Sequence, residues 1–463
     1  MSLSRRHLLG VSLGALAAPL AGCATTIGND PKTQSSPGAS VAVGNDPANP
    51  FGVANGSKVE AVIFNGGFGT EYAENAAAKM RSAAYKAQVN LRPVVDLQAD
   101  LQSRFVAGSP PDVFDNSGAK AIPKSAIAAQ AADLTSVLDA PGVDGTRLRE
   151  TVVPAVLDAG LYDGRLIALN YSLTLYGWWY SASMFSERGI TPPTTWDEML
   201  KLGEQAKKSG KYLFVFGKEA ASYYLWPIYG TAFKMGGDEV RKNLDNLKPD
   251  CWRQEPLVAA VNQIGECIKR GYVKPGGAGT QFTQAQTQWS LQQESLFYYS
   301  GSWIENEQKK QTKAGFEMTM LPDLTLPGTP KVNPRAALST ASESFMVPEK
   351  AANGAGGREF IRQLLSKEVA AKFATLTNSL SVVKGATPDR AKSSAGLKSQ
   401  VAILADSPEG TTMPKYGQYY QIDELPIMTA FLSGKLNAAQ FVDAMQKEFD
   451  RVAKDSSIKK VPL

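Results

Sequence analysis

The period of the apolar positions changes several times along the first third of the chain. Two β-branched apolar runs, 58–64 and 89–95, predict strands, and the short run 111–114 predicts a third. The segments 72–87 and 97–108 carry apolar residues at helical spacing and predict helices. Strands that alternate with helices in this order form a parallel sheet with right-handed crossovers. Ligands of such sheets gather beyond the carboxyl ends of the strands, so a site is expected in the loops that follow them.

The rest of the chain repeats this alternation and adds strong amphipathic helices. Thr195 precedes Glu198 by three residues, which is the pattern of a capping box at the start of a helix. Two further strands and two further helices are expected at 211–217 and 294–301, and at 358–376 and 437–455. The fold class is therefore α/β.

The N-terminus has the pattern of an export signal. Arg5 and Arg6 precede a short apolar segment that cannot span a bilayer as a mature helix, so 1–22 is predicted to be a signal peptide of twin-arginine type. The motif LAGC at 20–23 resembles the lipobox of bacterial lipoproteins, in which the cysteine, here Cys23, is lipidated. Ordinary cleavage beside an unrelated cysteine is the alternative.

A polar segment and a long globular part follow the signal. Residues 23–57 are rich in Gly, Pro, Ser, Asn and Asp without an apolar period, which predicts a flexible tether. The chain has 463 residues, and the part after the signal is too long for one hydrophobic core. Two domains are therefore expected.

Charge and histidine content exclude several functions. Loss of Arg5 and Arg6 with the signal lowers the formal net charge from +5 to +3, and no Lys/Arg run indicates nucleic acid binding. The single histidine, His7, lies in the signal, which excludes histidine triads and histidine metal sites from the mature protein. No metal and no cofactor are expected, and the glycines near Gly66 lack the spacing of a nucleotide-binding loop.

Two cysteines remain in the globular part, Cys251 and Cys267. An oxidising compartment favours a disulfide between them, and a pair of free thiols is the alternative.

Four segments resemble one known family. They are GSPPDVF at 108–114, YSASMFSERGITPPTTWDEML at 180–200, SYYLWP at 222–227 and SLFYYSGSW at 295–303. They resemble the extracellular solute-binding proteins of bacterial ABC sugar importers, of the maltose-binding type. Within this family, the many aromatic residues of these segments look most like those of the binding lipoproteins for N-acetylglucosamine and diacetylchitobiose. Ser181, Ser295 and Leu296 depart from the family pattern.

The resemblance implies a periplasmic-binding-protein fold of the type II, Venus-flytrap kind, with two discontinuous α/β lobes and a hinge of three chain crossings. Lobe 1 would be 58–172 and 343–410, and lobe 2 would be 173–342 and 411–463. It also implies a monomeric carbohydrate receptor without enzymatic activity. Such a receptor delivers its ligand to the transmembrane subunits of an ABC permease and is held by lipid at the outer face of the cytoplasmic membrane.

Aromatic rings are expected to line the cleft, because a ring covers the apolar face of a sugar. Trp303 follows a predicted strand and matches the family's GxW position, and Tyr223 and Trp226 lie in SYYLWP. In the stretch 170–185, Trp178 and Trp179 must point to opposite faces if this is a strand, so at most one of them lines the cleft; Trp178 is the candidate and Trp179 is the alternative.

Polar partners for the sugar hydroxyls are expected in the loops and crossings. Asn116, Glu343, and the pair Phe68 and Glu71 of the first loop are the candidates. Glu71 also suits a helix N-terminus, and Glu343 also suits a contact between the lobes or a surface position.

Two neighbouring carboxylates have other expected roles. Asp115, next to Asn116, could instead cap a helix, and Glu305 is expected to be solvated.

Two other functions stay open from the residues alone. A glycoside hydrolase needs two carboxyl groups at a defined separation, and the predicted loops offer no convincing pair. A different neutral solute is the second alternative, since the absence of histidine argues against a metal.

Overall fold

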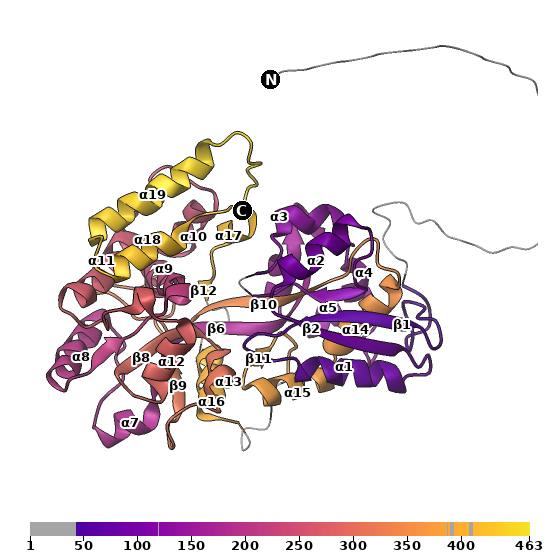
Figure 1. The fold of residues 1–463 in the computed structure, drawn as a ribbon, viewed down its shortest axis with the longest axis horizontal. Coiled ribbons are helices and arrows are strands. Elements are labelled where there is room, and N and C mark those ends of the chain that lie inside the picture. Colours follow the sequence, from indigo (N-terminus) through magenta and orange to yellow (C-terminus); the bar gives the residue numbers. More distant parts are fainter. Residues whose placement is uncertain (1–42, 119, 387, 389–392, 407–410) are drawn as a thin grey trace, which may run out of the picture. The chain divides into compact units, whose positions relative to one another are not determined.

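One sheet runs through the whole globular part of the chain. The computed structural model describes residues 43–118, 120–386, 388, 393–406 and 411–463. The main strand order is β2-β1-β3-β10-β6-β8-β7, and β9, β11 and β12 pair beside this path. Figure 1 shows the long strands β6 and β10 running from the β1–β2 end of the molecule towards β8 and β9.

The strands have the following bounds. They are β1 (Lys58–Phe64), β2 (Gln88–Val94), β3 (Val113–Asp115), β4 (Leu161–Tyr162), β5 (Arg165–Leu166), β6 (Leu169–Ser181), β7 (Tyr212–Phe214), β8 (Ser295–Gly301), β9 (Met318–Leu321), β10 (Leu338–Met346), β11 (Leu380–Ser381) and β12 (Thr411–Thr412).

The α-helices lie between and around these strands. They are α1 (Glu71–Ser82), α2 (Leu97–Val106), α3 (Lys124–Ile127), α4 (Thr135–Asp139), α5 (Leu148–Thr151), α6 (Ala155–Gly160), α7 (Ala182–Glu187), α8 (Trp196–Lys208), α9 (Leu225–Gly236), α10 (Asp238–Asp245), α11 (Glu255–Lys269), α12 (Phe282–Ser290), α13 (Ile304–Gln308), α14 (Gly354–Leu364), α15 (Lys367–Thr377), α16 (Ala395–Asp406), α17 (Tyr416–Tyr419), α18 (Glu424–Leu432) and α19 (Ala438–Lys454). The 3-10 helices are η1 (Ala128–Gln130), η2 (Lys218–Tyr224) and η3 (Gly277–Gly279).

The first three strands form the predicted parallel sheet. Ala61 of β1 pairs with Leu91 on one side and with Val113 on the other, both in parallel register. The parallel sheet predicted from the alternating pattern is confirmed, and its carboxyl ends lead into the loops after Phe64 and Asp115.

The strands β6 and β10 join the two ends of the sheet. They are antiparallel, with Ser172 opposite Ser342 and Leu169 opposite Phe345. β6 continues past this pairing to bond β8 and β9. The predicted lobe boundaries near 172 and 342 fall inside these two shared strands, and they stay predictions.

Two large cores lie on either face of the shared strands. The first holds Ile63, Phe345 and Phe360 and continues along one face of β6 to Trp179 and Trp289. The second lies on the other face and is built around Trp178, Trp196 and Trp252. Each core draws on segments from distant parts of the chain.

The globular part begins before β1. Phe51 and Val53 are buried in the first core, and Gly44 donates its backbone N–H to Pro50 O at 2.7 Å. The predicted tether therefore ends earlier than residue 57. The predicted signal peptide and Cys23 lie outside the described residues.

One long predicted helix is divided in the structure. The segment 358–376 forms the end of α14 and most of α15, with Ser366 between them in an extended conformation at φ −70° and ψ 146°. Serine is favoured before the first turn of a helix, and the Ser366 hydroxyl donates to Gln363 O at 2.7 Å. The break lets both helices bury apolar residues in the same core.

The predicted disulfide is wrong, because Cys251 and Cys267 are both free and buried. Cys251 precedes α11, whereas Cys267 lies near the far end of that helix. The 15 residues of α11 extend about 22 Å at about 1.5 Å per residue, while disulfides join Cα atoms less than about 7 Å apart. Burial raises the pKa of both thiols to about 12.

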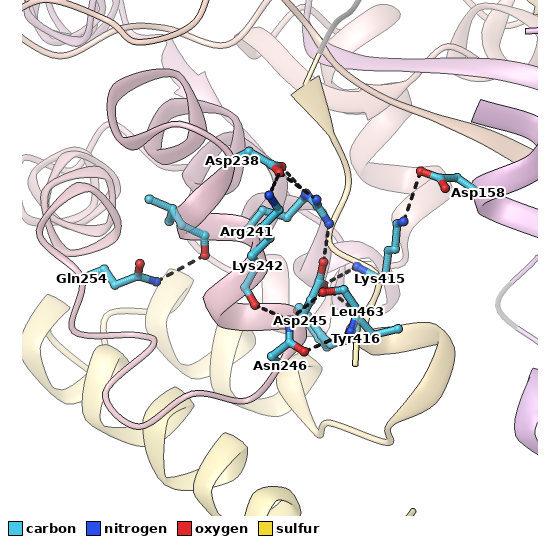
Figure 2. A network of polar contacts seen from close by, with 11 residues as sticks. Asp158, Asp238, Arg241, Lys242, Asp245, Asn246, Gln254, Lys415, Tyr416 and Leu463 are labelled. Atoms are coloured by element: carbon cyan, nitrogen blue, oxygen red, sulfur yellow. Dashed lines mark hydrogen bonds and ion pairs between the residues drawn. The ribbon is translucent and has the colours of Figure 1, made fainter. Parts of the chain in front are cut away.

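A buried carboxylate, that of Asp245, fixes the segment of chain that follows β12 (Figure 2). Asp245 of α10 accepts the backbone N–H groups of Lys415 and Tyr416 at 2.5 and 3.0 Å, and Arg241 at 2.5 Å. The Lys415 side chain reaches Asp158 of α6 at 3.2 Å. The segment after β12 is thus bonded to elements on both sides.

Candidate functional site

Four aromatic rings meet where β6, β8 and the η2–α9 junction converge. Tyr223 stacks on Trp226 with centroids 4.2 Å apart, and Trp303 stands nearly perpendicular to Trp226 at 6.1 Å. Tyr176 lies 4.7 Å from Trp226 and 5.8 Å from Trp303. We call these four residues the ring cluster.

The ring cluster contains the partly exposed tryptophans of the protein. The chain has seven tryptophans, and five of them are fully buried. Trp226 and Trp303 keep part of their surface, as does Tyr223. Large rings left partly uncovered side by side are typical of a surface that receives a ligand.

Local structure sets the position of Trp303. The ring follows β8 directly and turns back over the strand end, where a Cβ atom on Gly301 would lie 2.1 Å from its Cζ3. Glycine is therefore required at position 301 for the ring to occupy this place.

The first loop of the sheet contacts this region from the β1 side. The Asn306 amide donates to Gly67 O at 2.5 Å. A Cβ atom on Gly67 would lie 3.0 Å from Trp303 Cβ and 3.1 Å from Glu307 Oε1. The loops after β1 and after β8, which belong to opposite ends of the sheet, therefore meet beside Trp303.

A first carboxyl group, Glu343, lies in the middle of β10 and is partly buried. Its backbone has φ +57°, the left-handed region that a non-glycine residue rarely adopts within a strand. Burial, and then the charge of Asp115, raise the pKa of Glu343 to about 8. Among the described residues, Glu343 Oε2 is enclosed and has no hydrogen-bond partner.

A second carboxyl group, Glu307, follows Trp303 by one helical turn in α13. Burial raises its pKa to about 7, and Gln286 Nε2 donates to its Oε2 at 2.8 Å. Burial, then the negative charges of Glu307 and Glu343, raise the pKa of the Tyr223 phenol. Both carboxyl groups therefore act on the same ring of the cluster.

A hydrogen-bonded group lies beside Glu343. Asp115 Oδ2 accepts the phenols of Tyr72 and Tyr171 at 2.8 and 2.9 Å, and Ser117 bonds its other oxygen. Burial raises the pKa of Asp115 to about 6, and the hydrogen bonds from Ser117, Tyr72 and Tyr171 offset only part of this rise. Asp115 caps no helix and instead supports the strand ends that border Glu343.

The predicted site residues divide into two groups. The structure brings Tyr223, Trp226 and Trp303 together, and Glu343 acts electrostatically on Tyr176 and Tyr223 of this cluster. The remaining four candidates lie elsewhere.

Trp178 is the clearest error among these four. It is fully buried, 5.0 Å from Tyr299 and 5.4 Å from Phe214, so the prediction that it faces a ligand is wrong. Its alternative, Trp179, is fully buried in the other core. β6 has strands on both sides and a core on each face, so neither ring can reach a surface.

The other three candidates have local roles in the structure. Phe68 is buried edge-on against Phe373 at 5.3 Å. Glu71 is exposed at the first position of α1. The Asn116 amide donates to Ile122 O at 2.9 Å and accepts from Ile122 N at 2.8 Å, which closes its own loop.

Glu305 also differs from its expected state. It is buried rather than solvated, and it accepts the Ser394 hydroxyl at 2.9 Å. Burial raises its pKa to about 7.

Reasoning from the sequence missed Glu307. It lies four residues after Trp303, and this spacing places two side chains on one face of a helix. The short helix α13 was not predicted, so this signal was not available.

The described residues contain no group of three His, Cys, Asp or Glu side chains that could hold a metal ion. In the same part of the chain, no helix has the length and apolar character needed to cross a membrane.

Residues 75–403 match the model of the bacterial extracellular solute-binding proteins. The chain belongs to this family. The resemblance drawn from the four sequence segments is therefore confirmed, and so is the expectation of a binding protein rather than an enzyme. Membership also gives the solute-binding protein an extracytoplasmic location and an ABC permease as its partner.

Known relatives of this solute-binding protein include carbohydrate receptors. The diacetylchitobiose binding protein NgcE of Streptomyces coelicolor is 40% identical over 100% of this chain and 98% of its own length. Among solved structures, a chitin oligosaccharide binding protein has a TM-score of 0.68 at 18% identity, covering 86% of this chain and 99% of that one. The receptor RafE in complex with raffinose has a TM-score of 0.67 at 17% identity, covering 85% and 99%. The two-lobe fold is thereby confirmed.

Proposed function

We propose that this solute-binding protein captures a short saccharide of N-acetylglucosamine, with N,N′-diacetylchitobiose as the preferred ligand, at the ring cluster between its lobes. The observation that carries the proposal is the placing of Trp226 and Trp303. They are the tryptophans left partly exposed, their ring centroids are 6.1 Å apart, and two partly buried carboxyl groups, Glu307 and Glu343, act on the neighbouring ring of Tyr223. Rings cover the apolar face of a sugar, and carboxyl groups pair with its hydroxyls.

Full-length similarity to a diacetylchitobiose binding protein supports the choice of ligand. The captured saccharide is handed to the permease for import. The closed form is favoured by ligand because only then do both lobes contact it.

Isothermal titration tests the proposal with N,N′-diacetylchitobiose, N-acetylglucosamine, maltose and cellobiose. The protein is expected to bind the diacetylated disaccharide more tightly than the other three. Trp303→Ala is expected to weaken binding roughly tenfold to hundredfold, because about 1.5–3 kcal/mol of ring contact is lost and about 1.4 kcal/mol is a factor of ten.

Tyr212→Ala is the control, since Tyr212 is a partly exposed ring on β7 outside the ring cluster. A folded protein that binds none of the four saccharides would overturn the proposal. Tight binding of maltose or cellobiose alone would replace the ligand.

We further propose that the protein works as a monomer anchored by lipid at Cys23 to the outer face of the cytoplasmic membrane. The lipobox-like sequence LAGC and the family's extracytoplasmic location support the anchor. Two or more acyl chains are needed for durable anchoring. Cells fed labelled palmitate are expected to label the wild type and not Cys23→Ser. Equal labelling of both would contradict the anchor.

A further inference from the structure

Two carboxyl groups reach the ring cluster from different elements. Glu307 belongs to α13, next to Trp303, and its Oε1 lies close to Gly67 of the first loop. Glu343 belongs to β10 and acts electrostatically on Tyr176 and Tyr223. A ligand seated on the rings would therefore lie close to both carboxyl groups.

Neither carboxyl group has a full set of partners. Gln286 is the donor to Glu307, and one oxygen of Glu343 has no donor within the part of the chain that the structure describes. Leaving a buried polar atom unpaired costs about 1–3 kcal/mol, so such an atom at a ring cluster indicates a place for a ligand donor.

The backbone conformation of Glu343 also indicates a functional position. Its φ of +57° interrupts the pairing of β10 with β6, which resumes at Ser342 on one side and Ser344 on the other. Such a conformation costs of order 1–3 kcal/mol, persists only where the surrounding structure enforces it, and is found most often at functional sites.

The groups around the two carboxyls are acidic or neutral. Glu343 acts on Asp115 of β3, Tyr72 of α1, Tyr171 and Tyr176 of β6, and Tyr223 of η2, with Ser117 as its hydroxyl neighbour. Glu307 faces Gln286 of α12, Tyr298 of β8 and Tyr223. The ion pairs of the described residues include neither glutamate. Within the part of the chain that the structure describes, no neighbouring cation therefore offsets the cost of ionising them.

We propose that Glu307 and Glu343 both accept hydrogen bonds from hydroxyl groups of the saccharide, and that capture of the ligand releases protons to the solvent. This inference rests on the proposed function of the same site. For each glutamate, the carboxyl O–H bond breaks and its proton goes to the buffer. The carboxylate that forms then accepts a hydrogen bond from a hydroxyl group of the ligand.

The direction of the linkage follows from the two states of the site. In the protein alone, burial raises the pKa of Glu307 to about 7 and that of Glu343 to about 8, so both are more than half protonated below pH 7. Hydroxyl donors stabilise the ionised form and lower both pKa values in the complex. The affinity for the saccharide is therefore expected to be highest at about pH 8 and above, and to decrease steadily at lower pH.

The test is titration of wild-type protein with N,N′-diacetylchitobiose at pH 6.5 in buffers of different ionisation enthalpy. The slope of apparent enthalpy against buffer enthalpy gives the number of protons released, and about one or more per ligand is expected. The dissociation constant should fall by up to about tenfold per pH unit for each proton released.

Two variants assign the protons. Glu307→Gln and Glu343→Gln keep the shape but cannot ionise, so each is expected to remove its share of the release and to weaken binding at pH 8. Glu305→Gln is the matched control, because Glu305 is also buried with a raised pKa but bonds Ser394 away from the rings. It should leave the proton count unchanged.

Each outcome decides the inference. Release that is lost in Glu307→Gln and kept in Glu305→Gln supports it, even if Glu343→Gln fails to fold. Saccharide binding without proton release, or with proton uptake, overturns the inference and leaves the proposed function standing. Absence of binding by folded wild type overturns the proposed function and the inference with it.

Discussion

At the scale of the residue, Asp245 shows how one side chain can fix a connection. Its carboxylate is fully enclosed and accepts Arg241 together with the backbone N–H groups of Lys415 and Tyr416. The ion pair alone gives little net stability, because burying both charges costs as much as their attraction returns. The backbone bonds matter more, since they hold the segment after β12 in place.

Asp245→Ala is expected to lower the free energy of unfolding by about 3 kcal/mol, because it leaves Nη1 of Arg241 and two backbone N–H groups without their acceptor in a buried place, although Asp238 still pairs with the rest of the guanidinium. Asp245→Asn should cost less, since an amide oxygen still accepts. Guanidinium unfolding measures both. Asp443→Ala is the control, as it removes only an exposed partner of Arg253 and should change stability by under about 1 kcal/mol. Equal losses in Asp245→Ala and Asp443→Ala would contradict this assignment.

At the scale of the element, local pattern was enough for the strands and helices of the first parallel sheet and for several later elements. β1 begins and ends where its apolar run does, and the capping box of Thr195 and Glu198 is present with both of its hydrogen bonds. The break at Ser366 could not be predicted, because the apolar period continues across it and only the shape of the core requires the turn.

The site was predictable only in part. Trp303 follows a strand end and Trp226 lies in a family-like motif, and both signals are local. Trp178 failed because alternation tells which face a ring takes, but not whether that face is covered by another part of the chain. Glu307 was missed because its position depends on a short helix that only tertiary contacts stabilise.

At the scale of the whole molecule, hydrogen bonds join elements that the predicted boundaries assign to different lobes. Asn306 of α13 bonds Gly67 of the first loop, and Lys309 donates to Leu376 O at 2.9 Å. Such contacts between elements on opposite sides of shared strands are those that a hinge motion makes and breaks.

Ligand is expected to reduce the radius of gyration measured by small-angle X-ray scattering. Asn306→Ala should enlarge it in the absence of ligand and weaken saccharide binding about fivefold, because one hydrogen bond is worth about 1 kcal/mol. The control is Asn262→Ala, an exposed residue of α11. If Asn306→Ala matches the wild type in both measurements, the contact does not hold the closed form.

The shared strands and interleaved cores also constrain how this receptor can be altered. One core runs along β6 from Phe345 and Phe360 to Trp179 and Trp289, so it cannot be exchanged by a single splice in the gene. A chimaera of two related receptors would need several crossover points. Side chains from two different proteins would then have to pack together in one core. Under the proposed function, single substitutions around Trp226 and Trp303 are therefore expected to change ligand preference with the least disturbance of the two cores.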